Sequence, residues 1–241
     1  MHSPLLRARQ ENLLVNQSLS NRMLDLMVNT MPHLCVMNTV SKNQLTSVCV
    51  YCGSSFGSDS THEAAATRLG QLIAEAGLRL VYGGGSVGLM GTVANSALES
   101  GGKVTGIIPH FLEKREVMLE SLEDLIITKD MHERKHLMFQ KSDAFIALPG
   151  GIGTLEEAVE MMTWAQLGQH RKPVILANIN GFWSPLLELL DHMRAQGYIR
   201  PETEVPYLVA KKIEDILPLL RQAMSGKSQP PPGEVASITD L

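Results

Sequence analysis

The chain has 241 residues, a length that suits one large domain with tails and is sufficient to bury a full core. Hydrophobic residues make up 44% of it and charged residues 19%, as is typical of a globular protein. The net charge of -4 provides no basic footprint for a nucleic-acid polymer or an anionic membrane. No apolar run approaches the roughly 18 residues that span a bilayer, so we expect no membrane association.

The sequence indicates a cytoplasmic protein. It has an odd number of cysteines, Cys35, Cys49 and Cys52, which favours reduced thiols over a disulfide framework. Arg7 and Arg9 lie near the N-terminus, but no clean apolar stretch with a small-residue cleavage site accompanies them. We therefore expect no secretory signal.

Three zones follow one another along the chain. Residues 1–45 form an N-terminal extension with loosely helical apolar spacing, and the sequence does not decide between a docked helix and a mobile arm. Residues 46–224 form the main domain. Residues 225–241 include three consecutive prolines and few apolar side chains, so we interpret them as a disordered tail.

Short apolar runs alternate with helical segments through the main domain. The expected strands are residues 48–52, 78–82, 104–108, 125–127, 144–148 and 173–177. The expected helices are residues 60–76, 89–99, 132–141, 154–167, 185–196 and 213–224. This alternation predicts right-handed βαβ units, and the continuous apolar strands indicate a sheet buried on both faces. The fold class is therefore α/β, a Rossmann-like three-layer fold with a parallel sheet flanked by helices.

Two of these strands end in glycine clusters, at residues 83–91 and 149–154. Each cluster lies between a strand and a helix, at the sheet edge where open parallel sheets bind ligands. Glycine lets backbone N–H groups approach an anion, and the following helix contributes its positive dipole end. The alternative is that the glycines only make tight turns. Two clusters on one edge favour a phosphate site.

A dinucleotide site is a further alternative, because Gly83, Gly85 and Gly88 have the spacing G-x-G-x-x-G. That motif needs an acidic residue at the end of the next strand to hold the ribose hydroxyls. Residues 107–110 read Ile-Ile-Pro-His and contain no acid, which disfavours NAD. No G-x-x-x-x-G-K-[ST] sequence occurs, and we expect no cofactor.

Residues 132–136 match the zinc-peptidase motif H-E-x-x-H. Arg134 and Lys135 stand between the two histidines and would repel a dication, and the next histidine is distant at His170. We therefore expect no metal. The segment begins at the carboxyl end of a strand, where the planar guanidinium of Arg134 can contact a phosphate. The alternative for Arg134 is a solvated helix charge.

Two motifs resemble a known family. Met131-His132-Glu133-Arg134-Lys135, followed by Pro149-Gly150-Gly151-Ile152-Gly153-Thr154-Leu155-Glu156-Glu157, is similar to the signature of the LOG ("lonely guy") family of cytokinin riboside 5′-monophosphate phosphoribohydrolases. The resemblance covers residues 47–224.

This resemblance implies a Rossmann-like homodimer that hydrolyses a purine nucleoside monophosphate to free base and ribose 5-phosphate. It also implies that Arg134 and Glu157 are the catalytic pair. Glu116 lies in a shorter and looser match than the other implied contacts. The predicted substrate-binding residues are Ser54, Gly84, Gly85, Gly88, Glu116, Arg134, Lys135, Gly150, Gly151, Ile152, Gly153, Thr154, Leu155, Glu156, Glu157 and Thr163.

Cleavage of an N-glycosidic bond develops positive charge on the sugar, which a carboxylate such as Glu157 can stabilise. The alternative for Glu157 is a favourable charge at a helix N-terminus. At the level of function, the alternative is a nucleotide-binding or carrier protein without hydrolysis on the same fold. Members of the family often carry the label lysine decarboxylase, but no pyridoxal-phosphate signature is present. The sequence does not separate AMP from N6-prenylated AMP as the substrate.

Overall fold

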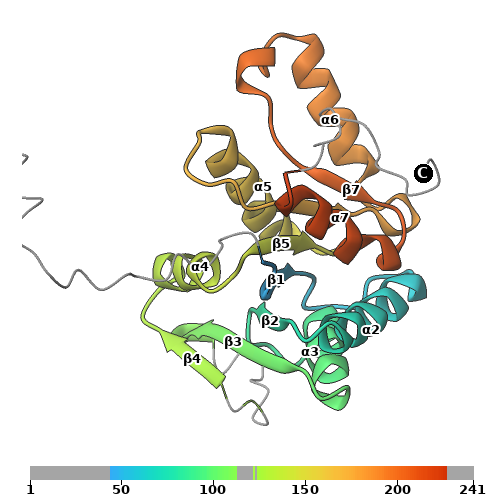
Figure 1. The fold of residues 1–241 in the computed structure, drawn as a ribbon, viewed down its shortest axis with the longest axis vertical. Helices are drawn as coiled ribbons and strands as arrows, with labels where there is room; N and C mark the ends of the chain where they lie inside the picture. The colour runs from blue at the N-terminus through green and yellow to red at the C-terminus, as the bar shows by residue number, and fades with distance from the viewer. Residues whose placement is uncertain (1–43, 113–121, 123, 227–241) are drawn as a thin grey trace, which may run out of the picture. The chain divides into compact units, whose positions relative to one another are not determined.

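A computed structural model describes residues 44–112, 122 and 124–226 of the chain. Seven strands form one parallel sheet in the order β4-β3-β2-β1-β5-β6-β7 (Figure 1). The strands are β1 Ser47–Tyr51, β2 Arg79–Tyr82, β3 Lys103–Pro109, β4 Asp124–Thr128, β5 Ala144–Ala147, β6 Val174–Ala177 and β7 Leu208–Ala210. The α-helices of the described part are α2 Ser60–Glu75, α3 Gly88–Glu99, α4 Met131–Gln140, α5 Ile152–Gln166, α6 Ser184–Ala195 and α7 Ile216–Met224.

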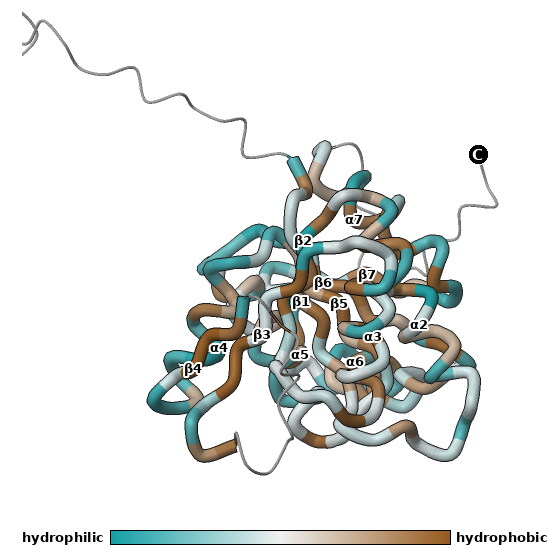
Figure 2. Tube along the Cα trace, turned by 90° about the horizontal axis from the view of Figure 1, so that it is seen from below, coloured by the Kyte–Doolittle hydropathy of each residue, from teal (hydrophilic) through white to brown (hydrophobic). Residues whose placement is uncertain are grey.

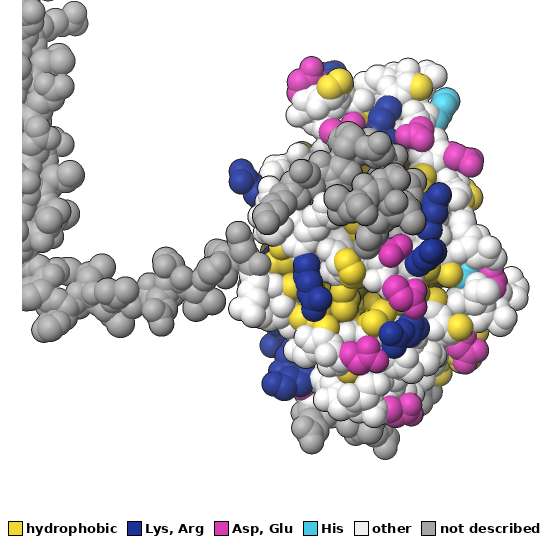
Figure 3. Space-filling model, turned by 45° about the vertical axis from the view of Figure 1, so that its right-hand side comes forward, with side chains coloured by type: hydrophobic (Ala, Val, Ile, Leu, Met, Phe, Trp, Pro, Cys, Tyr) yellow, Lys and Arg dark blue, Asp and Glu magenta, His cyan; other side chains and the backbone are white. Residues whose placement is uncertain are grey.

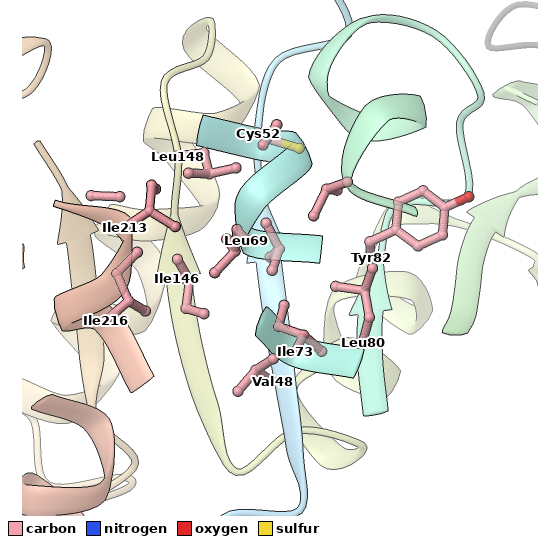
Figure 4. Packing of buried hydrophobic residues seen from close by; sticks show 14 of the residues in the cluster. Val48, Cys52, Leu69, Ile73, Leu80, Tyr82, Ile146, Leu148, Ile213 and Ile216 are labelled. Carbon is pink, nitrogen blue, oxygen red and sulfur yellow. The ribbon is translucent and has the colours of Figure 1, made fainter. Parts of the chain in front are cut away.

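Successive side chains of each strand point to opposite sides of the sheet. Both sets are buried, so the sheet is covered on both faces. In β1, Val48 and Val50 belong to a core shared with α2, α3 and α7 (Figure 4). Cys49 and Tyr51 belong to a second core shared with α4, α5 and α6. The central strands β1, β5 and β6 have the hydrophobic colour in Figure 2. These two cores confirm the predicted three-layer Rossmann-like fold.

Local signals set the helix ends. The carboxylate of Asp59 accepts a hydrogen bond of 2.9 Å from the backbone N–H of Thr61 and caps the first turn of α2. After α2 the chain turns at Gly77, whose φ of +68° is a left-handed conformation that glycine adopts without strain. These signals define the two ends of α2, whose buried apolar side chains pack on the sheet.

The strand order changes direction between β1 and β5. From β1 the chain adds β2, β3 and β4 on one side, and it then returns to place β5 against the other side of β1. Such a switch point leaves a crevice at the carboxyl edge of the sheet, which is the usual ligand site of this architecture. The loop after β1 and the glycine turn after β5 both lie at this edge of the sheet.

Most of the predicted elements are present. The sequence patterns did not predict β7, and the predicted helix 213–224 begins as a 3-10 turn, Ile213–Asp215, before α7. The predicted extension 1–45 lies outside the described residues except for its last two positions. The predicted tail 225–241 is described only at its first two, and Glu116 lies outside the described residues. The three domain boundaries remain predictions.

Candidate active site

The loops after β1 and β5 meet at the switch point through backbone contacts. The N–H of Gly53 donates a hydrogen bond of 3.1 Å to the carbonyl of Pro149. A Cβ on Gly150 would overlap the side chain of Thr154 and would lie 2.8 Å from the nitrogen of Gly53. Gly150 therefore permits the close packing of the two loops.

The glycine turn after β5 is open to solvent at the positions that follow Gly150. A Cβ on Gly151 or on Gly153 would meet no atom within 4 Å, and the side chain of Ile152 is 82% exposed. Helix α5 starts at Ile152, and Gly151 supplies no side-chain cap. The unpaired N–H groups of a first helical turn and the positive end of the helix dipole favour an anion. This turn has the free space and the polarity that a phosphate needs.

The second glycine cluster has a different role in the structure. A Cβ on Gly88, which has a φ of +58°, would overlap the backbone of Ser54 and Ser55. Gly84 also has a positive φ, of +81°, and Gly85 is buried. Gly88 thus lets the loop after β2 pack directly on the loop after β1, whereas a Cβ on Gly84 would meet Ile107 and Ile108 of β3. Substrate contact by Ser54 and by these three glycines remains a prediction.

Helix α4 is fixed at its start by a reciprocal cap. The carboxylate of Asp130 accepts a hydrogen bond of 2.9 Å from the N–H of Glu133. The carboxylate of Glu133 in turn accepts one of 2.9 Å from the N–H of Lys129. One ring nitrogen of His136 lies 2.7 Å from the side-chain amide of Gln140. The Glu and one His of the H-E-x-x-H match thus have helix partners.

Within the described residues, no group of three or more His, Cys, Asp or Glu side chains is placed to hold a metal ion. Over the same ranges, none of the helices has the length and apolarity that crossing a membrane requires. Figure 3 shows acidic and basic side chains interspersed on the face in view.

The predicted catalytic pair lies together in the interior, although the two residues are 23 positions apart in the chain. Arg134 of α4 is 7% exposed, and Glu157 of α5 is 9% exposed. The Nη1 of Arg134 donates to Oε1 of Glu157 at 2.5 Å, and its Nε donates to the carbonyl of Ile107 in β3 at 3.1 Å. The guanidinium thus connects β3 with the first part of α5.

The carboxylate of Glu157 is largely removed from water. Burial raises the pKa of Glu157 above its ordinary range, and the Arg134 guanidinium offsets part of that rise. Burial also raises the pKa values of Cys49 and Tyr51 in the neighbouring strand β1, so both remain protonated. A carboxylate with a raised pKa that is paired with a fixed cation is suited to proton transfer.

Lys135 faces a different direction from its neighbour Arg134. Its ammonium donates to the carboxylates of Glu156 at 2.7 Å and of Glu160 at 2.9 Å. Burial favours the neutral amine, but these hydrogen bonds outweigh it and raise the pKa of Lys135. A Schiff-base lysine needs a lowered pKa instead, so Lys135 does not fit that chemistry. It lines a groove of about 440 Å³ between α4 and α5, together with Trp164.

Thr163 is exposed on α5 and lies two turns beyond the buried Glu157. The structure thus brings Arg134, Glu157 and the glycine turn into one region and leaves Thr163 outside it. Sequence reasoning did not include Glu160, the second partner of Lys135. It considered Gly83 only as part of a dinucleotide motif and did not include it among the predicted site residues, although it borders Arg134. The run of three glycines at 83–85 was visible, but the sequence does not show which of them faces a charged group.

The parallel sheet, its switch point and the buried Arg–Glu pair beside an open glycine turn define a Rossmann-like protein with a nucleotide-type site. A family model described as "Possible lysine decarboxylase" matches residues 90–220. The chain is 46% identical over 175 residues to the "Probable cytokinin riboside 5'-monophosphate phosphoribohydrolase LOGL1" of Oryza sativa subsp. japonica, covering 73% of this chain and 78% of the relative. It is 47% identical over 176 residues to the "Cytokinin riboside 5'-monophosphate phosphoribohydrolase" of Rhodococcoides fascians, covering 73% and 89%. The chain belongs to this LOG family, as its motifs led us to expect.

Solved structures share the fold. The molybdenum cofactor carrier protein from Chlamydomonas reinhardtii aligns with a TM-score of 0.57 at 20% identity, over 76% of this chain and 99% of the carrier. The molybdenum cofactor binding protein from Rippkaea orientalis aligns with a TM-score of 0.54 at 26% identity, over 74% and 97%. The first likeness, at its low identity, supports the fold alone.

Proposed function

We propose that this chain hydrolyses the N-glycosidic bond of a purine riboside 5′-monophosphate of the cytokinin type, with an N6-modified adenine. The products are the free base and ribose 5-phosphate. The observation that carries the proposal is the buried ion pair between Arg134 and Glu157, one helical turn from the open glycine turn. Relatives that are 43–48% identical carry names for this activity.

The phosphate of the substrate binds the N–H groups of residues 151–154, at the positive end of α5. Glu157 lies three residues beyond Thr154, about 4.5 Å further along the helix axis. A phosphate held at the turn therefore brings the ribose toward the Glu157 carboxylate. Positioning of this kind contributes several kcal/mol to catalysis in general.

In the reaction, the bond from C1′ to the purine nitrogen breaks and its electron pair leaves with the base, which takes up a proton from solvent. Water adds its oxygen to C1′ and gives a proton to Glu157. The carboxylate first stabilises the positive charge on the sugar and then acts as the general base. Arg134 holds Glu157 in place and balances the negative charge of the site.

The assay that tests this proposal compares AMP and isopentenyladenosine monophosphate as substrates, with adenosine as the control that lacks the phosphate. We expect free base and an equal amount of ribose 5-phosphate from at least one monophosphate, and far less base from adenosine. Chromatography of the base with an enzymatic measurement of ribose 5-phosphate detects both products. Tight binding of the monophosphates without base release would support a non-hydrolytic carrier instead.

The active form that we propose is a homodimer. Helix α5 and its C-cap residue Leu167 present an outer row of exposed apolar side chains that also includes Ile152 and Val159, and Thr163 lies in the same row. Thr163 is about 9 Å along the helix from Glu157 and on another face. A second copy packed on this row would cover the apolar side chains and bring its Thr163 toward the substrate.

Replacing Val159 with aspartate tests the dimer. Light scattering coupled to size-exclusion chromatography should change from a dimer to a monomer, because the new charge is desolvated at the centre of the row. Glu63→Lys on the outer side of α2 is the control, and it should leave the mass unchanged. A monomeric wild-type protein with full activity would contradict the proposal.

We also propose a cytoplasmic location, which is consistent with the buried thiols of Cys49 and Cys52, neither of which forms a disulfide.

A further inference from the structure

The backbone of β2 passes close to the Arg134 side chain where the strand ends. A Cβ on Gly83, the residue after the strand, would lie 2.5 Å from Nη2 of Arg134 and 3.7 Å from its Cζ. The next nearest side chain is Met90, whose sulfur would lie 3.3 Å away at the end of a flexible chain that can give way. The φ of Gly83 is not in the left-handed region, so the backbone there accepts any L-residue. Glycine at position 83 is therefore important for the space that its missing side chain leaves to the Arg134 guanidinium, and not for its backbone conformation.

The guanidinium has little freedom to move from this place. Its Nε donates to the carbonyl of Ile107, and its Nη1 donates to Glu157. Nη2 faces the bare Cα of Gly83. A methyl group on Gly83 would therefore displace a planar group that is already held at two other points, and a shift of the plane would lengthen at least one of these hydrogen bonds.

We propose that Gly83 is a positioning residue for the hydrolysis, because the space above its Cα lets the Arg134 guanidinium reach the Glu157 carboxylate. The catalytic part of this inference rests on the proposed function. The structural part, that Gly83 sets the geometry of the ion pair, stands on the contacts alone.

The charge state of Glu157 reports on that geometry. Among the described residues, the titratable groups that interact electrostatically with Glu157 are Arg134 and Lys135 from α4, Glu156 from its own helix, and Cys49, Tyr51 and Cys52 from β1 and the residue after it. Of these, Arg134 is the strongest influence that stabilises the charged carboxylate. Burial raises the pKa of Glu157 and Arg134 lowers it. If Arg134 moves away, its lowering effect becomes smaller and the pKa of Glu157 should rise further.

The test is the substitution Gly83→Ala, with the Glu157 carboxyl titrated by NMR in protein that carries carbon-13-labelled glutamate. We expect its pKa to rise by about 1 pH unit, as is typical when an opposite charge moves away from a carboxylate. We expect kcat to fall by roughly 10- to 100-fold, since small misplacements of a catalytic group have effects of this size. KM should change little, because the glycine turn after β5 is unaltered.

A double-mutant cycle separates this role from general packing. In the Arg134→Met background the guanidinium is absent, so Gly83→Ala should leave the Glu157 titration unchanged. The matched control is Gly70→Ala, whose Cβ would lie 2.5 Å from the carbonyl of Val93 in the core on the other face of the sheet. Gly70→Ala should lower stability without moving the pKa of Glu157.

An unchanged Glu157 titration in folded Gly83→Ala protein would overturn the inference. If Gly83→Ala does not fold, the double variant with Arg134→Met should still fold as well as Arg134→Met alone, and its failure to do so would equally overturn it. Absence of hydrolysis by the wild-type protein would contradict the proposed function only. The titration would still decide the role of Gly83.

Discussion

Substituting Glu157 with glutamine should lower the rate of base release by about 10²- to 10⁴-fold, the usual contribution of a general acid or base. Glutamine keeps the shape of the side chain and can still accept a hydrogen bond from Arg134. It has no negative charge to stabilise the developing oxocarbenium ion and cannot take a proton from water. Single-turnover kinetics with a nucleoside monophosphate measure the effect directly, and binding of the phosphate should persist.

The matched control is Glu160→Gln, one turn further along α5, where the carboxylate pairs with Lys135. Its rate should stay within a few-fold of the wild type, since it lies away from the Arg134 pair. The pH profile offers a second check. Glu157 acts as a carboxylate with a raised pKa, so activity should fall as the pH drops through a value above the ordinary glutamate range. Near-normal base release by the glutamine variant would exclude this role for Glu157.

The sequence predicted the architecture well because buried parallel strands have a strong pattern. Six of the strands are short, mostly apolar runs bounded by turn residues, and all six are present. Strand β7 escaped detection because it has only three residues, Leu208–Ala210. Three apolar residues in a row do not distinguish a strand from a buried loop or the end of a helix.

The site was predictable at the level of motifs but not of contacts. The sequence indicated anion binding at both glycine clusters, whereas the structure separates their roles. A Cβ on Gly88 would overlap a neighbouring loop, while one on Gly151 would meet open space. That difference depends on which segments meet in the fold, and residues 54 and 88 are far apart in the chain. Local pattern contains no information on such contacts.

The same limit applies to the pair of charges. The resemblance to the LOG family implied that Arg134 and Glu157 act together, but it did not indicate that the two groups are almost completely buried. Nor did it show that the neighbouring Lys135 points to a different pair of carboxylates. Successive residues of a helix point about 100° apart, so adjacent charged residues can serve different sites.

Replacing Arg134 with methionine should therefore destabilise the protein as well as inactivate it. Removing one partner of a buried ion pair typically costs about 3–5 kcal/mol, because the other charge remains buried and unpaired. Urea unfolding at neutral pH should report a decrease in the free energy of unfolding of this order. Thermal unfolding should show a melting temperature lower by roughly 2–4 °C for each kcal/mol. The double variant with Glu157→Met should recover much of the loss, since a well-packed apolar pair replaces the two charges.

The pH dependence of that loss identifies its cause. Without Arg134, the pKa of Glu157 in the folded state should rise further above its unfolded value, because Arg134 is the main group that offsets the effect of burial on this pKa. A raised folded pKa stabilises the fold below the unfolded pKa, and this stabilisation disappears as the pH increases through the folded pKa. Arg134→Met should accordingly be closest to the wild type in stability in acid and furthest from it in alkaline solution. A stability deficit that is equal at all pH values would mean that lost packing, and not the unpaired charge of Glu157, destabilises the variant.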